Sequence, residues 1–247
     1  MSEATANHDP VWSAQAAHDS LRHVSPESPC AYLPGRMARH EAYLSTGLDD
    51  AGYTMLLAKG FRRSGGIVYR PRCRGCHECR QVRVLTQDFL PTRSMRRVLR
   101  RNADIRVEEA PPVPTAEKFA MFTRYLDGQH DGTMSRDLDS FVGFLYQSPL
   151  RTSEFHYYLG DRIIGISLAD RCEDGLSSVY MYFDPNDGRR SLGTFSVLWE
   201  IDYCRRNALA YYYLGYYVAG SRTMAYKSRF RPLEVLVADD RWMALPG

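Results

Sequence analysis

The amino-acid sequence has no apolar run approaching the about 20 residues that are needed to cross a bilayer. Its first residues, MSEATANHDPVW, include acids but no basic segment of the kind that begins a signal peptide. These absences predict a cytoplasmic protein that makes no membrane contact. Thiols stay reduced in that compartment, so a cysteine cluster there indicates metal or redox chemistry more often than disulfides.

Several well-defined catalytic motifs are also missing. No glycine-rich run ends in Gly-Lys-Ser or Gly-Lys-Thr, no Gly-x-Ser-x-Gly elbow is present, and no dinucleotide-binding fingerprint occurs. The segment His40-Glu41 begins like a zinc-protease helix but lacks the second histidine. The sequence therefore argues against P-loop nucleotide hydrolysis, serine-hydrolase chemistry and zinc proteolysis.

What the sequence does have is a concentrated stretch of positive charge. Between Lys59 and Arg106, 14 lysines and arginines stand against three acids, whereas the 247-residue chain has a net charge of only +3. Such a field favours a polyanionic partner, and nucleic acid is the first candidate. Spacings of three and four place five arginines of a predicted helix largely on one face, where the alternative is an ordinary solvated surface: Arg93, Arg96, Arg97, Arg100 and Arg101.

Three cysteines with two-residue spacings lie inside the basic stretch. Thiolates at this spacing suit zinc or an iron–sulfur cluster, with Cys30 as the distant fourth ligand to Cys73, Cys76 and Cys79. His77 can replace one of the thiolates. The neighbouring arginines are expected to lower the thiol pKa values and so favour thiolates. Reduced structural thiols without a metal are the alternative.

Periodicity and turn signals predict two domains. Helices are predicted at 49–60, 92–102, 116–129, 138–146 and 191–207, and strands at 61–70, 81–85, 153–159, 162–170, 177–183 and 211–218. The segment 37–44 is read as a short helical turn or an irregular approach to the first sheet. The proline-dense segment 110–115 is expected to be a stiff linker. It would separate a basic, cysteine-containing domain at 29–109 from a domain at 116–247, after an irregular arm at 1–28.

The order of elements after the linker predicts an α+β fold. Two helices, an antiparallel meander, a helix and a strand are typical of an acetyltransferase-like (GNAT-type) mixed sheet with flanking helices. The segment around Arg190 loosely resembles the phosphate-gripping loop of N-acetyltransferases. The smaller N-terminal domain is expected to be α/β and to carry the cysteine cluster.

Several separate motifs resemble one known family. GFRRSG at 60–65, YRP at 69–71 and the cysteine group resemble the N-terminal domain of arginyl-tRNA–protein transferases. YLGYY at 213–217 and MAYKSRFRP at 224–232 resemble the other half of that family. CAYL at 30–33, together with LLAKGFRRSG at 56–65, is similar to the bacterial branch, the aspartate/glutamate leucyltransferases.

The resemblance implies transfer of leucine from leucyl-tRNA to the α-amine of proteins that begin with Asp or Glu, which marks them for N-degron degradation. The tRNA ester is already activated, so positioning supplies most of the catalysis and the chemistry requires no cofactor. Bidentate cations suit the acidic side chain, and the predicted set is Arg62, Arg63, Lys227, Arg229 and Arg231. The candidates for assisting proton transfer are Tyr216, Tyr217 and Glu154. The predicted tRNA-binding residues are Lys59, Arg93, Arg96, Arg97, Arg100, Arg101 and Arg190.

Three other functions remain open at this stage. Arginine, rather than leucine, is an alternative transferred residue. The basic stretch and the cysteines alone would also fit a non-catalytic, metal-dependent RNA-binding module, and the segment at 190–193 would fit a coenzyme A acetyltransferase. The RNA-binding module leaves the second domain unexplained, and the coenzyme A acetyltransferase leaves the basic domain unexplained.

Overall fold

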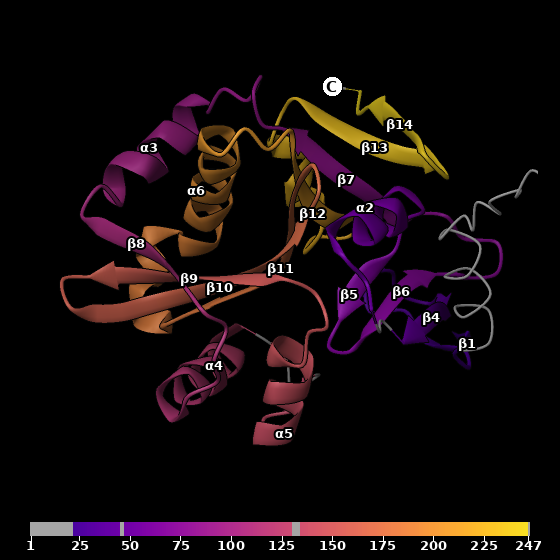
Figure 1. Cartoon of the computed structure of the whole chain (residues 1–247), viewed down its shortest axis with the longest axis horizontal. Coiled ribbons are helices and arrows are strands. Elements are labelled where there is room, and N and C mark those ends of the chain that lie inside the picture. Colours follow the sequence, from indigo (N-terminus) through magenta and orange to yellow (C-terminus); the bar gives the residue numbers. More distant parts are fainter. Residues whose placement is uncertain (1–21, 45–46, 130–133, 247) are drawn as a thin grey trace, which may run out of the picture.

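The computed structural model describes residues 22–44, 47–129 and 134–246, and its largest feature is a mixed sheet of eight strands (Figure 1). Their order across the sheet is β14-β13-β7-β12-β11-β10-β9-β8. The strands are β7 (Arg80–Leu85), β8 (Ile105–Ala110), β9 (Thr152–Leu159), β10 (Arg162–Cys172), β11 (Gly175–Phe183), β12 (Tyr211–Tyr217), β13 (Leu233–Ala238) and β14 (Arg241–Ala244).

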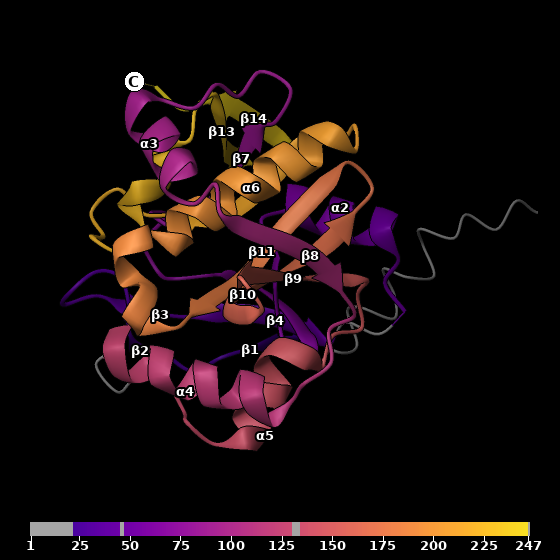
Figure 2. The ribbon, with the colours of Figure 1, turned by 90° about the vertical axis from the view of Figure 1, so that its left-hand side faces the viewer.

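Helices cover both faces of this sheet (Figure 2). On one face lie α3 (Arg93–Arg101) and α6 (Leu192–Arg206); on the other lie α4 (Ala116–Gln129) and α5 (Leu138–Phe141), which continues as a π-helical segment, Val142–Tyr146. Strand alternation explains the two cores, because successive side chains point to opposite faces. On β11, Phe183 packs in the α6 cluster, whereas Tyr182 packs in the cluster of α4 and α5.

A smaller sheet packs beside the large one. Its order is β1 (His23–Val24), β4 (His40–Leu44), β6 (Ile67–Pro71) and β5 (Arg62–Ser64), and beside it lie the hairpin of β2 (Ser28–Pro29) and β3 (Met37–Ala38) and helix α2 (Asp50–Ala58). The buried side chains of Tyr53, Leu57 and Val68 form one cluster with Cys172 and Tyr213 of the large sheet. The two sheets therefore share a hydrophobic core.

The predicted linker does not separate the two sheets. Strands β7 and β8 both precede residue 111, yet β7 lies inside the large sheet between β12 and β13, and β8 forms its edge. The segment 111–115 therefore joins β8 to α4 within one body. The chain passes from the small sheet to the large one at the cysteine segment between β6 and β7, about 30 residues earlier than the sequence predicted.

The α+β class is confirmed, and the structure corrects individual elements. The segment 61–70 is a hairpin rather than one strand, because Gly65, at φ +57°, reverses the chain between β5 and β6. The segment 37–44 forms β3 and β4 rather than a helical turn. Strands β8, β13 and β14 were not predicted. None of the helices in the described part of the chain is long and apolar enough to cross a membrane.

Candidate active site

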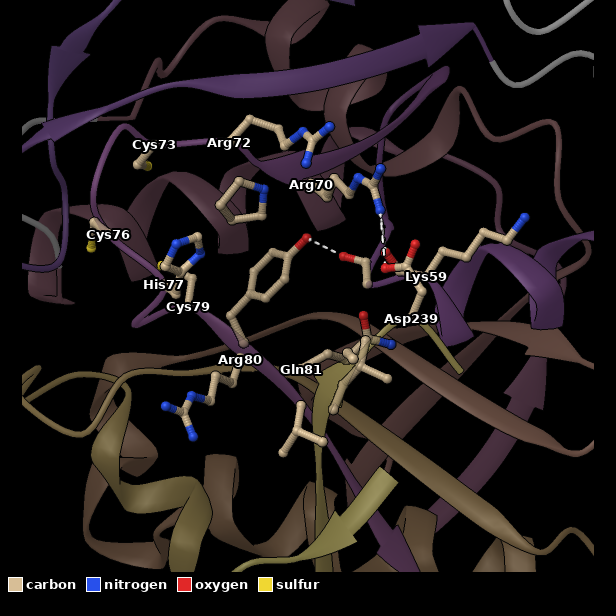
Figure 3. Close-up of a pocket in the computed structure, with 16 residues that line it drawn as sticks. Lys59, Arg70, Arg72, Cys73, Cys76, His77, Cys79, Arg80, Gln81 and Asp239 are labelled. Carbon is tan, nitrogen blue, oxygen red and sulfur yellow. Dashed lines mark hydrogen bonds and ion pairs between the residues drawn. The ribbon is translucent and has the colours of Figure 1, made fainter. Parts of the chain in front are cut away.

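A pocket of about 350 Å³ opens between the small sheet and the β7–β13 side of the large sheet (Figure 3). Its walls come from the end of α2, from β6, from the cysteine segment and from β7, β12 and β13. The ring of Tyr216 lines the pocket, together with one acid, Asp239. Four cationic residues also line it: Lys59, Arg70, Arg72 and Arg80. Gln81 also lines the pocket.

A buried carboxylate fixes one wall of the pocket. Glu41 on β4 is 2% exposed and accepts from Arg70 at 2.9 Å, with Arg22 and Arg72 at 2.7 and 3.0 Å. Burial of Glu41 acts to raise its pKa, but the hydrogen bonds and charges of its partners prevail and lower it. Arg70 also donates to the Lys59 carbonyl at 2.9 Å, which ties β6 to the end of α2.

The pocket has a surplus of positive charge. Arg70 and Arg72 share the single charge of Glu41, and Arg70 also approaches Asp239 at 3.5 Å. Within the described residues, the side chains of Lys59 and Arg80 make no ion pair. These two cations line the pocket without a paired acid, and such a surplus of positive charge favours a negatively charged ligand.

Tyr216 supports the pocket wall rather than supplying a base. Its hydroxyl donates to the carbonyls of Gly60 at 2.8 Å and Tyr69 at 3.1 Å. Burial raises the pKa of Tyr216 well above its usual value, so the phenol stays protonated at neutral pH. These bonds join β12 to α2 and β6.

The two arginines of the GFRRSG motif lie beneath the surface rather than in the pocket. Arg63 donates to Asp170 at 2.7 Å, and both side chains are fully excluded from solvent. Arg62 donates to the hydroxyl of Ser177 at 3.0 Å and to the carbonyl of Ser178. These bonds hold the small sheet to β10 and β11, and they leave neither guanidinium open to a substrate carboxylate.

The turn after these arginines is also packed. The Gly65 N–H donates to the carbonyl of Phe144 at 3.2 Å, and a Cβ at Gly65 would lie 2.4 Å from the carbonyl oxygen of Gly143. The turn therefore docks on the π-helical segment, which fixes the end of the GFRRSG motif.

The other three cations of the predicted acid-binding set divide between buried and exposed positions. Lys227 is 7% exposed and donates to the Tyr216 carbonyl at 2.7 Å. Burial, followed by the charge of Arg62, lowers the pKa of Lys227 to about 7. Arg231 donates to the carbonyls of Leu245 and Pro246, where it holds the end of the described chain, and Arg229 is exposed.

The three predicted proton-transfer residues do not converge. Glu154 on β9 is fully buried and accepts from Lys118 and His156. Strands β10 and β11 separate it from β12, a span of roughly 14 Å at about 4.8 Å per strand. Tyr217 points away from the pocket and packs against the α6 core cluster.

Helix α3 presents all five of its predicted arginines to solvent. Thr92 caps the helix, and Met95, Val98 and Leu99 pack toward α6, which leaves the polar side outward. Arg96 and Arg101 donate to backbone carbonyls at 2.6 Å, whereas Arg93, Arg97 and Arg100 make no ion pair with the described residues. Arg190 lies near this helix, but it forms a bidentate pair with Asp104 at 2.8 and 3.0 Å.

The cysteine segment forms the far edge of the pocket (Figure 3). The sulfur of Cys73 accepts from the Arg39 N–H at 3.4 Å, and that of Cys76 from Arg36 at 3.3 Å. The expectation that arginines lower the thiol pKa is wrong for Cys79: burial, then the neighbouring cysteines, raise its pKa to about 12. No group of three or more His, Cys, Asp or Glu in the described chain is arranged to hold a metal ion. A zinc or iron–sulfur site stays a prediction for metal analysis of the purified protein.

Comparison with known proteins places the chain in a family. The family models described as the N terminus and the C terminus of arginine-tRNA-protein transferase match residues 28–97 and 117–237. A protein of Hahella chejuensis named aspartate/glutamate leucyltransferase is 39% identical over 228 residues, which cover 90% of this chain and 96% of the relative. One of the same name from Thiobacillus denitrificans is 41% identical over 219 residues, covering 87% and 91%. The chain belongs to the aspartate/glutamate leucyltransferase family.

One solved structure has a weak similarity to this chain. It is the C-terminal domain of a putative lysylphosphatidylglycerol synthetase from Agrobacterium fabrum, with a TM-score of 0.42 and 15% identity. The alignment covers 57% of this chain and 46% of that one.

The two family segments meet at the pocket. Lining residues from Lys59 to Gln81 fall in the N-terminal match, whereas Tyr216, Leu236 and Val237 fall in the C-terminal match. The sequence-based site omitted Arg70, Arg72, Arg80 and Gln81, although all lie in the basic stretch that the charge count singled out. Polar residues flanking the cysteine motif were the available signal.

Proposed function

We propose that the protein transfers leucine from leucyl-tRNA to the α-amine of proteins whose N-terminal residue is Asp or Glu. The pocket is the observation that carries this proposal. Segments matched by the two family models both contribute lining residues to one cavity with surplus positive charge. The relatives' name, aspartate/glutamate leucyltransferase, supplies the amino acid and the acceptor residues. The product would be a protein with a new N-terminal leucine, a degradation signal.

The reaction is aminolysis of an ester. The nitrogen of the acceptor α-amine attacks the leucyl carbonyl carbon, the bond from that carbon to the ribose oxygen breaks, and the amine loses a proton as the ribose hydroxyl gains one. An N-terminal amine has a pKa of about 7.7–8.0, so a sizeable minority is neutral at pH 7. Alignment of amine and ester therefore supplies most of the acceleration.

We propose that α3 holds the tRNA by its phosphates. Its arginines face solvent, and Arg93, Arg97 and Arg100 are not engaged by acids of the described chain. Phosphate contacts by arginine are strong and sequence-independent. Lys59 is proposed to act at the pocket, nearer the charged end of the tRNA. Arg190 is proposed to support the tRNA site indirectly. Its ion pair with Asp104 joins the start of β8 to the segment before α6.

We also propose that the large sheet is of the acetyltransferase (GNAT) type. Three features support this: the antiparallel run β9-β10-β11, the return through α6, and a β12 parallel to β11. The parallel pairing is limited to three positions that end at Ser177 and Tyr213, and Arg62 bonds to both residues where the strands part. A cytoplasmic location suits a protein that uses charged tRNA.

Peptide labelling tests the proposal. The purified protein is incubated with radiolabelled leucyl-tRNA or arginyl-tRNA and with peptides that begin with Asp, Glu or Arg but are otherwise identical. We expect label from leucyl-tRNA on the Asp and Glu peptides alone. Label from arginyl-tRNA would assign the arginyl activity, and tRNA binding without any labelling would assign the RNA-binding module.

A further inference from the structure

The side chain of Gln81 is buried without hydrogen-bond partners. It is 1% exposed, and neither its Nε2 nor its Oε1 meets a partner. The other buried atoms of the described chain in this condition belong to Arg63, Asn102 and Glu154, and each of those side chains makes bonds through another atom. At Gln81 the whole amide is unsatisfied. Buried polar groups in folded proteins are nearly always paired, so this amide is available to bond with a group from outside the described chain.

The amide faces the pocket. Gln81 lies opposite Tyr216 in the β7–β12 register, and both side chains line the cavity (Figure 3). Val82 and Val84 alternate with it along β7 and pack in the α6 core, so the strand pleat directs Gln81 to the other face. The next residue toward the cysteine segment is Arg80, and Lys59, just after α2, also lines the pocket.

An N-terminal acidic residue matches these groups. Its carboxylate accepts from the amide Nε2–H and is attracted by the neighbouring Arg80, which makes no ion pair in the described part of the chain. Its α-amine is a donor a few bonds away, and the Oε1 of Gln81 is the acceptor within the same amide. We propose that this pocket receives the N-terminal Asp or Glu of the acceptor protein and that Gln81 reads it. The inference rests on the proposed function for the identity of the acceptor.

The terminal adenosine of the tRNA is the rival occupant. A glutamine amide also pairs with adenine, which presents a donor and an acceptor side by side. The adenine base itself is neutral, however, and the phosphate of that nucleotide lies a ribose away from it, whereas an acidic side chain brings its carboxylate directly to the amide and the cation beside it. The surplus positive charge therefore favours the acidic residue.

The test replaces Gln81 by methionine, which keeps its length and removes both polar atoms. The matched control is Gln87→Met, at an exposed position just after β7. Affinity is measured by fluorescence anisotropy with C-terminally labelled peptides that begin with Asp or Ala, without tRNA. Transfer kinetics then give KM for the Asp peptide and for leucyl-tRNA separately.

We expect Gln81→Met to weaken binding of the Asp peptide and raise its KM by about 10- to 100-fold, as when hydrogen bonds to a charged group are lost. KM for leucyl-tRNA and binding of the Ala peptide should stay within twofold, and Tm should be unchanged or higher because an unpaired buried amide is removed. Gln87→Met should behave as wild type.

Three outcomes overturn the inference: unchanged affinity for the Asp peptide, a rise in KM for leucyl-tRNA instead, or a marked fall in Tm that assigns Gln81 a structural role. Arg80→Met provides a second variant at an exposed position, and it should lower affinity for the Asp peptide but not for the Ala peptide. If the wild-type protein binds the Asp peptide through Gln81 yet transfers no leucine, the proposed function fails while the pocket assignment stands. If the wild-type protein transfers leucine and Gln81→Met is without effect, the proposed function stands and the pocket assignment fails.

Discussion

Arg63 and Asp170 form an ion pair that is closed to solvent on both sides. The Nε–Oδ2 distance is 2.7 Å, and Thr152 donates to the other carboxylate oxygen at 2.7 Å. Arg63 belongs to the small sheet and Asp170 to β10, so the pair joins the two sheets at their shared core. A motif that resembles a substrate-binding signature therefore acts here as an internal brace.

Loss of this brace should cost stability. In Arg63→Met, the Asp170 carboxylate stays buried without its cation, and breaking a buried pair in this way costs about 3–5 kcal/mol. Urea unfolding at pH 7 measures the change in free energy. Arg74→Met is the control, because Arg74 is 81% exposed and its pair with Glu27 spans 3.6 Å; its effect should stay below about 1 kcal/mol. A similar small effect at Arg63 would contradict the brace.

Glu200 should make the protein less stable as pH rises. The carboxyl is fully buried and accepts from Ser167 and Tyr212 at 2.6 Å, and burial raises its pKa from 4.5 to about 7. Between these values the folded state holds a proton that the unfolded state releases, so stability is full below pH 4.5 and falls as pH rises through 7. The loss amounts to about 3 kcal/mol at 1.36 kcal/mol per pKa unit.

Urea unfolding from pH 5 to pH 8 tests this, with Glu200→Gln as the comparison. Residue 200 of the variant cannot ionise, so its free energy of unfolding should not decline between pH 5 and pH 7. Lys227 affects stability over a different pH range. Its pKa is lowered to about 7, so its contribution is constant below pH 7 and favours the folded state increasingly toward pH 10.5. Parallel curves for wild type and Glu200→Gln below pH 7 would show that Glu200 does not titrate as argued.

Gly215 should not tolerate a side chain. Its φ is +85°, and a Cβ there would lie 3.3 Å from the guanidinium of Arg62, where β11 and β12 part. Gly215→Ala should therefore cost about 1–3 kcal/mol from backbone strain, seen as a lower Tm. Gly193→Ala, near the start of α6 with nothing within 4 Å, should be neutral or slightly stabilising. Equal Tm values for the two variants would exclude strain at Gly215.

The parts of the fold that the sequence predicted are those with local signals. Helix α3 follows from its run of good helix formers, and the β9–β10 hairpin follows from the Gly160-Asp161 turn signal. The position of β7 inside the large sheet could not be read, because its partners in β12 and β13 lie more than 120 residues further along the chain. Sequence periodicity carries no information about such pairing.

The same limit governs the site. The basic stretch predicted that this region carries function, and the pocket does lie along it. The sequence does not reveal which arginines are engaged by acids, because the acid that pairs with Arg63 lies 107 residues away along the chain. Gln81 was missed for a related reason: one glutamine in a strand has no pattern, and its lack of partners exists only in three dimensions.

Helix α3 should account for much of the salt dependence of tRNA binding. Each arginine that neutralises a phosphate releases counterions, so the slope of log affinity against log salt should fall by about 1 per contact removed. Replacing Arg93, Arg97 and Arg100 together by glutamine should thus reduce the slope by about 3, measured by filter binding of leucyl-tRNA from 50 to 200 mM salt. Arg205→Gln and Arg206→Gln on α6, also exposed but paired with Asp202, form the control and should leave the slope unchanged. Because these α3 side chains make no ion pair in the described chain, their removal should leave Tm and the affinity for Asp-starting peptides unaltered. A slope equal to that of wild type would move the tRNA site away from α3, and the cations around the pocket would then be the remaining candidates.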